Sequence, residues 1–421
     1  MPLPASSNSQ AEPSSGPPAT VAASAAESAP PLAPAPTIAP PKPPSTEPVG
    51  SLEQPQSLVH LFEALSKLQD GSATSDVRFV QHGDSHTAAD FGTGAVRRSL
   101  QLKFGDGGRG FVAMGQPWKG YAQNDISTGM TGFVSVKTKY SKGKFSGDGL
   151  YGLGGGGIEG SGIGASAWTR VRVATSQFEI AYLKQPKGGT FDVFVDGSSV
   201  GQVTTEGGDI ESGFSSFSTA EGSHKIEVRL QGDGTVRIFG VALDRATNGV
   251  VLDSLGINGA QIISALRWKE RHLIEQVKHR DPTAFILAYG TNESTGMMPS
   301  EEYERKLKEL IRRFKSASPE ASCVLLGPPD RAVKRAPGEW KTAPRILEVV
   351  ESQRSVAKEV GCAFYDQLAA MGGPGSIAKW ANEQKPRATS DHVHLTKRGY
   401  VQLAESFVTD LVTAYEQWRT R

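Results

Sequence analysis

The sequence predicts an α/β fold, a doubly wound parallel sheet with helices on both faces, that is interrupted by an inserted β-sandwich or jelly-roll domain. Strand-like apolar runs alternate with helical segments in residues 51–117 and again in residues 248–421, which is typical of parallel sheets. In residues 118–247, short alternating runs are separated by glycine-rich turns, which is typical of antiparallel β domains. Residues 1–50 are mostly Pro, Ala and Ser, so we expect a disordered linker there.

The composition argues against several classes of partner. The net charge of +1 gives no bulk attraction to nucleic acid or to an anionic membrane. No apolar run is long enough to cross a membrane. The short basic cluster at residues 331–335 is interpreted as solvated surface. The length and composition leave the oligomeric state open.

The two cysteines, Cys323 and Cys362, exclude a disulfide scaffold and a cysteine-based zinc cage. We expect both to be buried packing residues, with a single bridge between them as the alternative. The N-terminus lacks the pattern of a secretion signal. Proline-rich linkers of this kind commonly tether envelope enzymes, so we expect a periplasmic, cell-envelope or secreted protein whose export signal has been removed.

The first part of the chain is predicted to hold one strand between two helices. Residues 52–68 have the apolar spacing of an amphipathic helix, residues 77–83 form a buried strand that ends at a glycine, and residues 88–102 are again helical. The glycine-rich residues 104–110 lack the Lys-Ser/Thr pair of a phosphate-binding loop. We expect them to form a flexible loop beside the site or a route into the inserted domain.

The inserted domain is predicted to contain strands at residues 132–139, 168–174, 178–183, 190–195, 225–230 and 235–243. Asp233-Gly234 is a hairpin-turn signal, and residues 152–164 predict a mobile glycine-rich loop. In the last part we expect strands at residues 250–252, 283–289, 322–326 and 363–365, and helices at residues 259–270, 301–315, 345–360 and 396–415. The strand at residues 77–83 belongs to this same sheet, so the β domain interrupts the α/β domain.

Polar and small residues follow the ends of the predicted parallel strands. Ser85 follows the first strand, residues 256–259 the second and residues 290–293 the third, and residues 391–394 precede the last helix. Ligands bind beyond the carboxyl ends of parallel strands, and hydrolases place a serine nucleophile on a strand-to-helix turn. Taken alone, Ser85 is equally well part of an ordinary turn that Asp84 caps. The later stretches favour catalysis.

Four blocks of the sequence resemble, in order, residue type and spacing, the blocks of the SGNH (GDSL-type) hydrolases: Gly83-Asp84-Ser85-His86, Gly259, Gly290-Thr291-Asn292-Glu293 and Asp391-His392-Val393-His394. The resemblance covers about residues 52–111 and 250–421. His86 replaces the usual Leu and Glu293 the usual Asp, at positions to which the family assigns no essential role. The insertion and residues 83–87, 239–243 and 371–376 resemble bacterial peptidoglycan O-acetylesterases, in which the insertion is similar to a family-35 carbohydrate-binding module.

The resemblance implies a role for each candidate residue. Ser85 attacks an ester carbonyl, His394 takes and returns the proton, and Asp391 orients the imidazole. The candidate oxyanion donors are the backbone N–H groups of Ser85 and Gly259 and the side-chain amide of Asn292. No metal and no cofactor is implied.

Several alternatives accompany these roles. His392 competes with His394 as the base, but only His394 has the family spacing from Asp391. Gly256 is the second candidate for the position of Gly259, which is also explained by a helix start. His82 and His86 flank the nucleophile, but no accompanying carboxylate–histidine pattern indicates a metal site. We expect the aromatic residues Tyr289 and Trp380 to pack.

The expected function is therefore that of a serine esterase that removes O-acetyl groups from a polysaccharide, with O-acetylated peptidoglycan as the expected substrate on the strength of the resemblance. An O-acetyltransferase with the same acyl-enzyme is the first alternative, because a sugar hydroxyl can replace water in the second step. A non-catalytic glycan-binding protein is the second alternative, against which the presence of Ser85, His394 and Asp391 argues. The inserted domain would hold the glycan near Ser85.

Overall fold

The computed structural model describes residues 49–141 and 144–421, and the predicted linker at residues 1–48 lies outside the described residues. The described residues belong to one compact unit. Within them, no helix is both long enough and apolar enough to span a bilayer.

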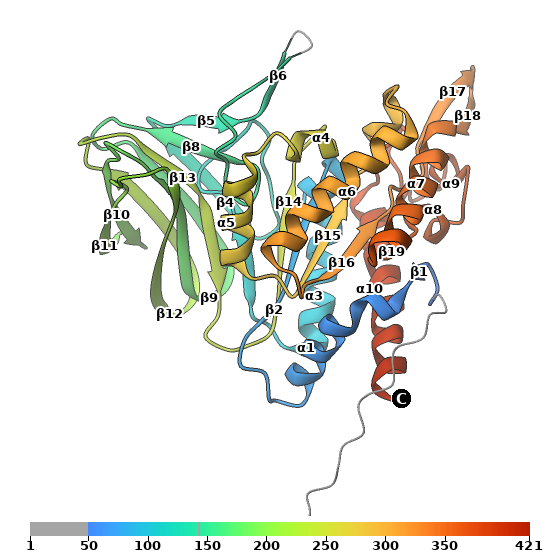
Figure 1. Cartoon of the computed structure of the whole chain (residues 1–421), viewed down its shortest axis with the longest axis horizontal. Helices are drawn as coiled ribbons and strands as arrows, with labels where there is room; N and C mark the ends of the chain where they lie inside the picture. Colours follow the sequence, from blue (N-terminus) through green and yellow to red (C-terminus); the bar gives the residue numbers. More distant parts are fainter. Residues whose placement is uncertain (1–48, 142–143) are drawn as a thin grey trace, which may run out of the picture. The chain divides into compact units, whose positions relative to one another are not determined.

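A six-stranded sheet forms the centre of the α/β part, in the order β1-β19-β16-β15-β2-β14 (Figure 1). The strand bounds are β1 Leu52–Glu53, β2 Val77–Gly83, β14 Val250–Gly256, β15 Ala284–Ala288, β16 Ser322–Leu326 and β19 Ala363–Tyr365. All neighbours pair in parallel except the edge strand β1. Because β2 lies between β14 and β15, strands from before and after the insertion share one sheet, as predicted.

Helices cover both faces of this sheet because successive strand residues point to opposite sides. Phe285 and Leu287 join the core under α5 (Glu270–Arg280), α6 (Ser300–Ala317) and α7 (Pro344–Val360). Ala284 and Ile286 join the core under α1 (Val59–Gln69), α3 (Phe91–Phe104) and α10 (Lys397–Arg419). The mixed α/β fold with a parallel sheet is therefore confirmed.

Three predicted helices have different bounds in the structure. Residues 52–68 form β1, the 3₁₀ turn η1 (Pro55–Leu58) and α1, because Pro55 begins a new turn. Residues 88–102 belong to α2 (Ser85–Ala88) and α3, which are separated by Asp90 in a left-handed conformation with φ 56°. Residues 259–270 hold only α4 (Ile262–Ala265), and α5 follows separately.

Asp90 is fixed in its left-handed conformation by buried charge. Its carboxylate accepts hydrogen bonds from Thr93, Arg97 and Arg109 at 2.7–3.2 Å. No local sequence pattern predicts this network, because Arg109 lies on β3, 19 positions after Asp90, and meets it only in the folded protein.

The insertion forms an antiparallel sheet of nine strands among the described residues, with its main path β11-β10-β12-β9-β13-β8-β5 and with β3 and β4 paired to β13 and β9. Its strands are β3 Gly108–Val112, β4 Ile126–Thr131, β5 Val134–Lys137, β8 Gly156–Gly160, β9 Ser166–Lys184, β10 Thr190–Val195, β11 Ser198–Thr204, β12 Glu211–Leu230 and β13 Val236–Asp244. A separate hairpin pairs β6 (Lys139–Ser141) with β7 (Lys144–Ser146). The sandwich assignment and the domain bounds stay predictions.

Several details of the predicted insertion are wrong. The runs at 168–174 and 178–183 are one long strand, β9, and the predicted loops at 104–110 and 152–164 contain β3 and β8. Asp233-Gly234 does not close a hairpin, since β12 pairs with β9 and β10 whereas β13 pairs with β9, β8 and β3. A dipeptide signal fixes the turn but not the partner strand.

The remaining elements lie at the end of the α/β part that follows β15, β16 and β19. They are η2 (Glu293–Thr295), the hairpin β17 (Ala332–Ala336) and β18 (Glu339–Thr342), and the short helices α8 (Gln367–Ala370) and α9 (Ser376–Ala381). The sequence analysis predicted none of these, because each is too short to show a hydrophobic period.

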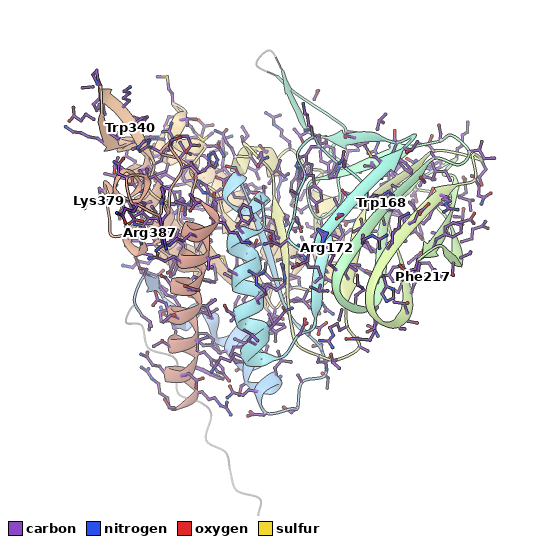
Figure 2. The ribbon with its side chains drawn as sticks, turned by 180° about the vertical axis from the view of Figure 1, so that it is seen from behind. Trp168, Arg172, Phe217, Trp340, Lys379 and Arg387 are labelled. Atoms are coloured by element: carbon purple, nitrogen blue, oxygen red, sulfur yellow. A yellow bond between two sulfur atoms is a disulfide. The ribbon has the colours of Figure 1, made fainter. Side chains whose placement is uncertain are left out.

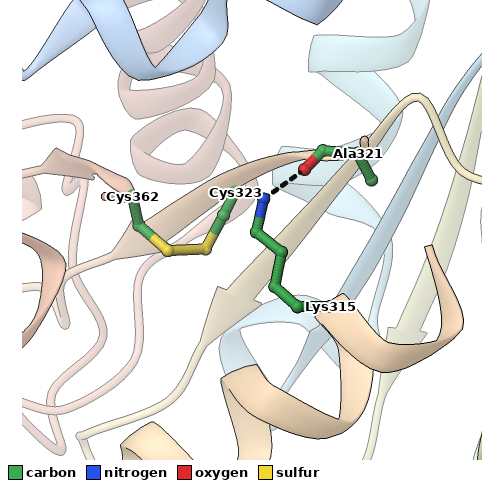
Figure 3. The surroundings of a disulfide bond; sticks show 4 residues. All are labelled: Lys315, Ala321, Cys323 and Cys362. Atoms are coloured by element: carbon green, nitrogen blue, oxygen red, sulfur yellow. Dashed lines mark hydrogen bonds between the residues drawn. A yellow bond between two sulfur atoms is a disulfide. The ribbon is translucent and has the colours of Figure 1, made fainter. Parts of the chain in front are cut away.

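Cys323 and Cys362 are buried, as expected, and they form a disulfide (Figure 3), which is the alternative that the sequence left open. Cys323 lies on β16, and Cys362 directly precedes its neighbour β19. Beside the bridge, the Lys315 ammonium donates a hydrogen bond to the carbonyl oxygen of Ala321 at 2.7 Å. Closing a loop of this length stabilises the fold by about 2 to 4 kcal/mol.

Candidate active site

Ser85 lies at the carboxyl edge of the central sheet, on the turn from β2 to α2. The strand ends at Gly83, and the Asp84 carboxylate accepts the backbone N–H of His86 at 2.9 Å, which caps α2. This short turn presents the Ser85 side chain beyond the sheet. Ser85 Oγ lies 2.9 Å from His394 Nε2, a hydrogen-bond distance between residues 309 positions apart.

The loop between α9 and α10 supplies the other two residues. His394 Nδ1 lies 2.7 Å from Asp391 Oδ2, so Nδ1 carries the proton and Nε2 accepts from Ser85 Oγ–H. Burial opposes ionisation of Asp391, but hydrogen bonds from the Thr389 hydroxyl, the His394 ring and two backbone N–H groups prevail and hold its pKa well below the usual range. Asp391 is therefore a carboxylate at any physiological pH.

The His394 and Asp391 side chains are 40% and 49% exposed. A water molecule or a bulky substrate can therefore reach the hydrogen-bonded chain without a large movement of the protein. The structure thus brings together Ser85, His394 and Asp391, the three residues predicted to react.

His392, the alternative base, is held away from Ser85. It adopts φ 57°, and its ring stacks on Trp340 of β18 with centroids 3.8 Å apart. His392 Nδ1 lies 2.9 Å from the carbonyl oxygen of Ser390, to which it donates. The choice of His394 as the base stays a prediction.

Two of the three candidate oxyanion donors line one groove. Gly259 and Asn292 line this groove, which has a volume of about 660 Å³. Gly259 has φ 76°, and no atom lies within 4 Å of the position that a β-carbon would take, so its backbone is open to a ligand. Among the described residues, the N–H groups of Ser85 and Gly259 have no protein acceptor.

Asn292 is less free than this prediction requires. Its amide nitrogen donates to the carbonyl oxygen of Ala260 at 3.0 Å and to Asp84 Oδ2 at 3.3 Å. To bind an oxyanion it has to release the longer of these bonds, to Asp84. The oxyanion assignments stay predictions.

Gly256, the alternative to Gly259, has a packing role. A β-carbon there would lie 2.2 Å from the backbone nitrogen of Ala88. The absence of a side chain therefore lets α2 lie directly on the end of β14, beside Ser85.

Glu293 is a residue of the site whose role the sequence analysis missed. Its carboxylate accepts the N–H of Ile262 at 2.7 Å and the N–H of Gly290 at 3.0 Å. It thereby ties the loop after β15 to the start of α4, the two segments that line the groove. Burial raises the pKa of Glu293 to about 7. The sequence feature that could have indicated this role is Glu293 itself, which stands after Asn292 where the resembled family usually has Asp.

Asp84 shares this environment. Burial, with a smaller contribution from the charge of Glu293, raises the pKa of Asp84 to about 7, although the N–H of His86 stabilises its anion. Two buried carboxyls thus lie behind the nucleophile, and both titrate near neutral pH.

The histidines that flank Ser85 have structural contacts. His86 Nδ1 lies 3.0 Å from the Tyr400 hydroxyl, and its ring centroid is 5.3 Å from that of His394. Burial, and then the proximity of His394, lowers the pKa of His86 to about 3. His82 is buried among Trp268 and Phe314, and burial lowers its pKa to about 3. Both rings are therefore neutral.

Within residues 49–141 and 144–421, no cluster of three or more His, Cys, Asp or Glu residues has the geometry to hold a metal ion. Tyr289 and Trp380 are both 3% exposed, in agreement with the prediction that they pack.

The groove itself is lined from both parts of the chain, with Trp118, Lys137 and Gly155 from the insertion and Asn258 and Gln261 from the α/β part.

A serine hydrogen-bonded to a carboxylate-bound histidine, at the carboxyl edge of a doubly wound parallel sheet, is the arrangement of a serine-type ester hydrolase. Comparison with known proteins gives a family-model match over part of the chain. Residues 216–402 match the model of the GDSL-like lipase/acylhydrolase family. The chain carries a GDSL-like acylhydrolase domain and is a carboxylic ester hydrolase.

Solved structures give more detail. The chain is 25% identical to a solved peptidoglycan O-acetylesterase, with a TM-score of 0.71, and the match covers 85% of this chain and 96% of that chain. A family two carbohydrate esterase from Cellvibrio japonicus is 13% identical, with a TM-score of 0.28 and coverage of 69% and 99%. A family two carbohydrate esterase from Clostridium thermocellum is 10% identical, with a TM-score of 0.28 and coverage of 68% and 98%. No curated protein sequence matches.

Proposed function

We propose that this protein removes O-acetyl groups from a cell-envelope polysaccharide, and that O-acetylated peptidoglycan is its substrate. The observation that carries the proposal is the chain of hydrogen bonds from Ser85 Oγ to His394 Nε2, at 2.9 Å, and from His394 Nδ1 to Asp391 Oδ2, at 2.7 Å. The choice of substrate is supported by the likeness to a peptidoglycan O-acetylesterase over most of both chains.

In the proposed mechanism, Ser85 Oγ attacks the acetyl carbonyl carbon while His394 Nε2 takes its proton. Asp391 stabilises the imidazolium that forms. The tetrahedral oxyanion is bound by the N–H groups of Ser85 and Gly259 and by the Asn292 amide, each donor being worth about 3 to 4 kcal/mol in the transition state. The C–O bond to the sugar then breaks as His394 protonates the leaving sugar oxygen.

Water completes the cycle. His394 takes a proton from a water molecule that attacks the acetyl-Ser85 ester, and acetate leaves as Ser85 recovers its proton. His394 is 40% exposed, so water can reach the ring.

The groove supports a polymeric substrate. It runs between the insertion, through Trp118 and Lys137, and the loop that carries Gly259. In this proposal the insertion is a β-sandwich of the carbohydrate-binding type that holds the glycan, and residues 118–247 form it. The disulfide between Cys323 and Cys362 supports a periplasmic, envelope or secreted location, since such bonds persist in oxidising compartments.

The test is a panel of substrates assayed for free acetate: O-acetylated peptidoglycan, acetylated xylan and p-nitrophenyl acetate. We expect release from all three, with the highest kcat/KM for peptidoglycan. Ser85→Ala should abolish release, and Ser199→Ala, a change on the exposed strand β11, should leave it intact. Equal activity of Ser85→Ala would overturn the mechanism, and a preference for xylan would overturn the substrate.

The same panel separates hydrolysis from transfer. Added oligosaccharide acceptors are recovered and examined for acetyl groups by mass spectrometry. Acetylated acceptors with little free acetate would identify an O-acetyltransferase and overturn the esterase proposal.

A further inference from the structure

A cluster of basic side chains lies beside the loop that carries Asp391 and His394. We call it the basic flank and define it as residues 331–341, which cover most of the hairpin β17–β18, and residues 379–398, which run from α9 through this loop into α10. It contains nine basic residues and three acidic ones, although the whole chain has a net charge of +1. The basic residues are Arg331, Lys334, Arg335, Lys341, Lys379, Lys385, Arg387, Lys397 and Arg398.

Most of these charges face solvent without a counter-ion. Lys334, Arg335, Lys379, Lys385 and Lys397 are exposed. Among the described residues, none of these five side chains has a carboxylate within 4.0 Å, whereas Lys341 pairs with Glu339 and Arg387 pairs with Glu383. Like charges that are gathered on one surface repel one another and raise the local concentration of anions.

The hairpin is fixed to the catalytic loop. The Trp340 indole stacks on His392, with ring centroids 3.8 Å apart and planes 13° apart, and the N–H of Ala332 donates to the His392 carbonyl oxygen at 2.9 Å. His392 lies between Asp391 and His394 in sequence. Figure 2 shows Trp340, Lys379 and Arg387 close together on one flank of the α/β part. The unpaired charges are therefore held at a constant position relative to the reacting residues.

Ester hydrolysis gives no reason for this charge. An acetyl ester and its sugar are neutral, and the proposed oxyanion donors are backbone N–H groups and an amide, so the reaction itself makes no use of the exposed ammonium and guanidinium groups. The amino groups of Lys and the planar guanidinium of Arg bind carboxylates by charge-assisted hydrogen bonds.

We propose that the basic flank binds carboxylate groups of the polymeric substrate and so selects an anionic glycan over a neutral one. The inference rests on the proposed function: peptidoglycan carries free carboxylates on the short peptides attached to its glycan strands, whereas xylan and aryl acetates lack such peptides. The glycan would lie in the groove with its acetyl group at Ser85, and a carboxylate would reach Lys334, Arg335 or Lys379 on the hairpin and α9.

The test compares two triple variants of the full chain that change the net charge equally. Lys334→Glu, Arg335→Glu and Lys379→Glu reverse the basic flank. Lys67→Glu, Lys278→Glu and Lys358→Glu are the matched control: Lys67 and Lys278 lie with the starts of β2 and β15, at the opposite edge of the sheet, and Lys358 lies in the last turn of α7. Each protein is assayed on O-acetylated peptidoglycan, on the same material with its carboxylates amidated, and on p-nitrophenyl acetate.

We expect reversal of the basic flank to raise KM for native peptidoglycan about tenfold at low salt, since each exposed ion pair contributes a few-fold. The increase should shrink at high salt. Rates on p-nitrophenyl acetate should change less than about twofold, which shows that the variant is folded and that its reacting residues are intact. Amidation should raise KM for the wild type and for the control, and should add little for the reversed variant.

Three outcomes would overturn the inference. An unchanged KM for native peptidoglycan in the reversed variant excludes a role for these charges. An equal increase in the control variant shows an effect of net charge only. If charge reversal raises KM but amidation does not, the ligand is another anion such as a phosphodiester of the envelope. Failure of the wild type to release acetate from any substrate contradicts the proposed function instead.

Discussion

His392 lies flat against Trp340, with the planes of the two rings 13° apart, and so joins the loop that carries His394 to the hairpin β17–β18. The residue is 7% exposed and has φ 57°, a conformation that side chains other than glycine adopt at some cost. The contact therefore holds a strained turn between Asp391 and His394, the two residues whose alignment with Ser85 the proposed mechanism requires.

Trp340→Ala is expected to lower kcat for p-nitrophenyl acetate about tenfold, because stacked rings contribute about 0.5 to 1.5 kcal/mol that would no longer hold the loop. KM should change little. Trp340→Phe, which retains a ring, should recover most of the activity. Steady-state kinetics measure both, and equal loss in the two variants would show that stacking does not matter.

Asp391→Asn is expected to lower kcat by about 10³- to 10⁴-fold, because the amide favours the wrong tautomer of His394 and leaves its charged form without a counter-ion. The midpoint of thermal unfolding should change only slightly, since the Asp391 side chain is half exposed. Thr389→Val removes one hydrogen bond to the carboxylate and should have a much smaller effect. A rate within tenfold of wild type for Asp391→Asn would show that another group orients the histidine.

Asp84 and Glu293 predict a loss of stability with rising pH. Burial raises the folded-state pKa of both to about 7, so the folded protein keeps protons that the unfolded chain releases near pH 4. Stability is therefore greatest below the unfolded pKa and falls as the pH rises through 7. A shift of three pKa units corresponds to at most about 4 kcal/mol for each group.

The measurement is the midpoint of thermal unfolding between pH 4.5 and pH 8.5. The midpoint should fall with pH in the wild type and less steeply in Asp84→Asn, whose side-chain oxygen can still accept the N–H of His86. Asp366→Asn, in which the changed carboxylate caps α8, is the control and should keep the slope of the wild type. A midpoint that is flat or rises over this range would contradict the raised pKa values.

Gly259→Ala tests the open backbone of the groove. The φ of 76° costs an alanine about 1 to 2 kcal/mol, although no atom obstructs the methyl group itself. We expect a small decrease in stability and a larger decrease in kcat/KM, about tenfold or more, because the methyl group would enter the space beside the acetyl carbonyl. Gly256→Ala, which clashes with α2, should instead lower the unfolding midpoint and the soluble yield. If Gly259→Ala retained full activity, this N–H would not contact the oxyanion.

The disulfide gives a prediction for stability. Cys323→Ser with Cys362→Ser should lower the free energy of unfolding by about 2 to 4 kcal/mol without changing KM, because the bridge lies between β16 and β19 and not in the groove. Addition of a reductant should shift the wild type toward this variant and leave the variant unchanged. Equal unfolding curves for the wild type with and without reductant would show that the bridge is absent in solution.

The sequence was informative where a short segment has few alternative structures. The strands at 322–326 and 363–365 were predicted with their observed bounds, because continuous apolar runs bounded by turns have few other solutions. Ser85, Asp391 and His394 were selected from block order and spacing, and the structure brings their side chains within hydrogen-bond distance. The helix break at Asp90 and the pairing of β12 were missed, because both depend on residues that are distant in sequence.

By itself, then, the sequence determined the α/β fold, because the periodicity of short segments predicts strands and helices. Its resemblance to a known family selected the three residues expected to react. Only the tertiary structure decided that Cys323 is bonded to Cys362, that Glu293 ties two loops of the groove together, and that the charged hairpin lies against the loop of His394. Each of these is a contact between segments that the chain brings together only by folding, and the physical cause is packing and buried charge, which no local pattern records.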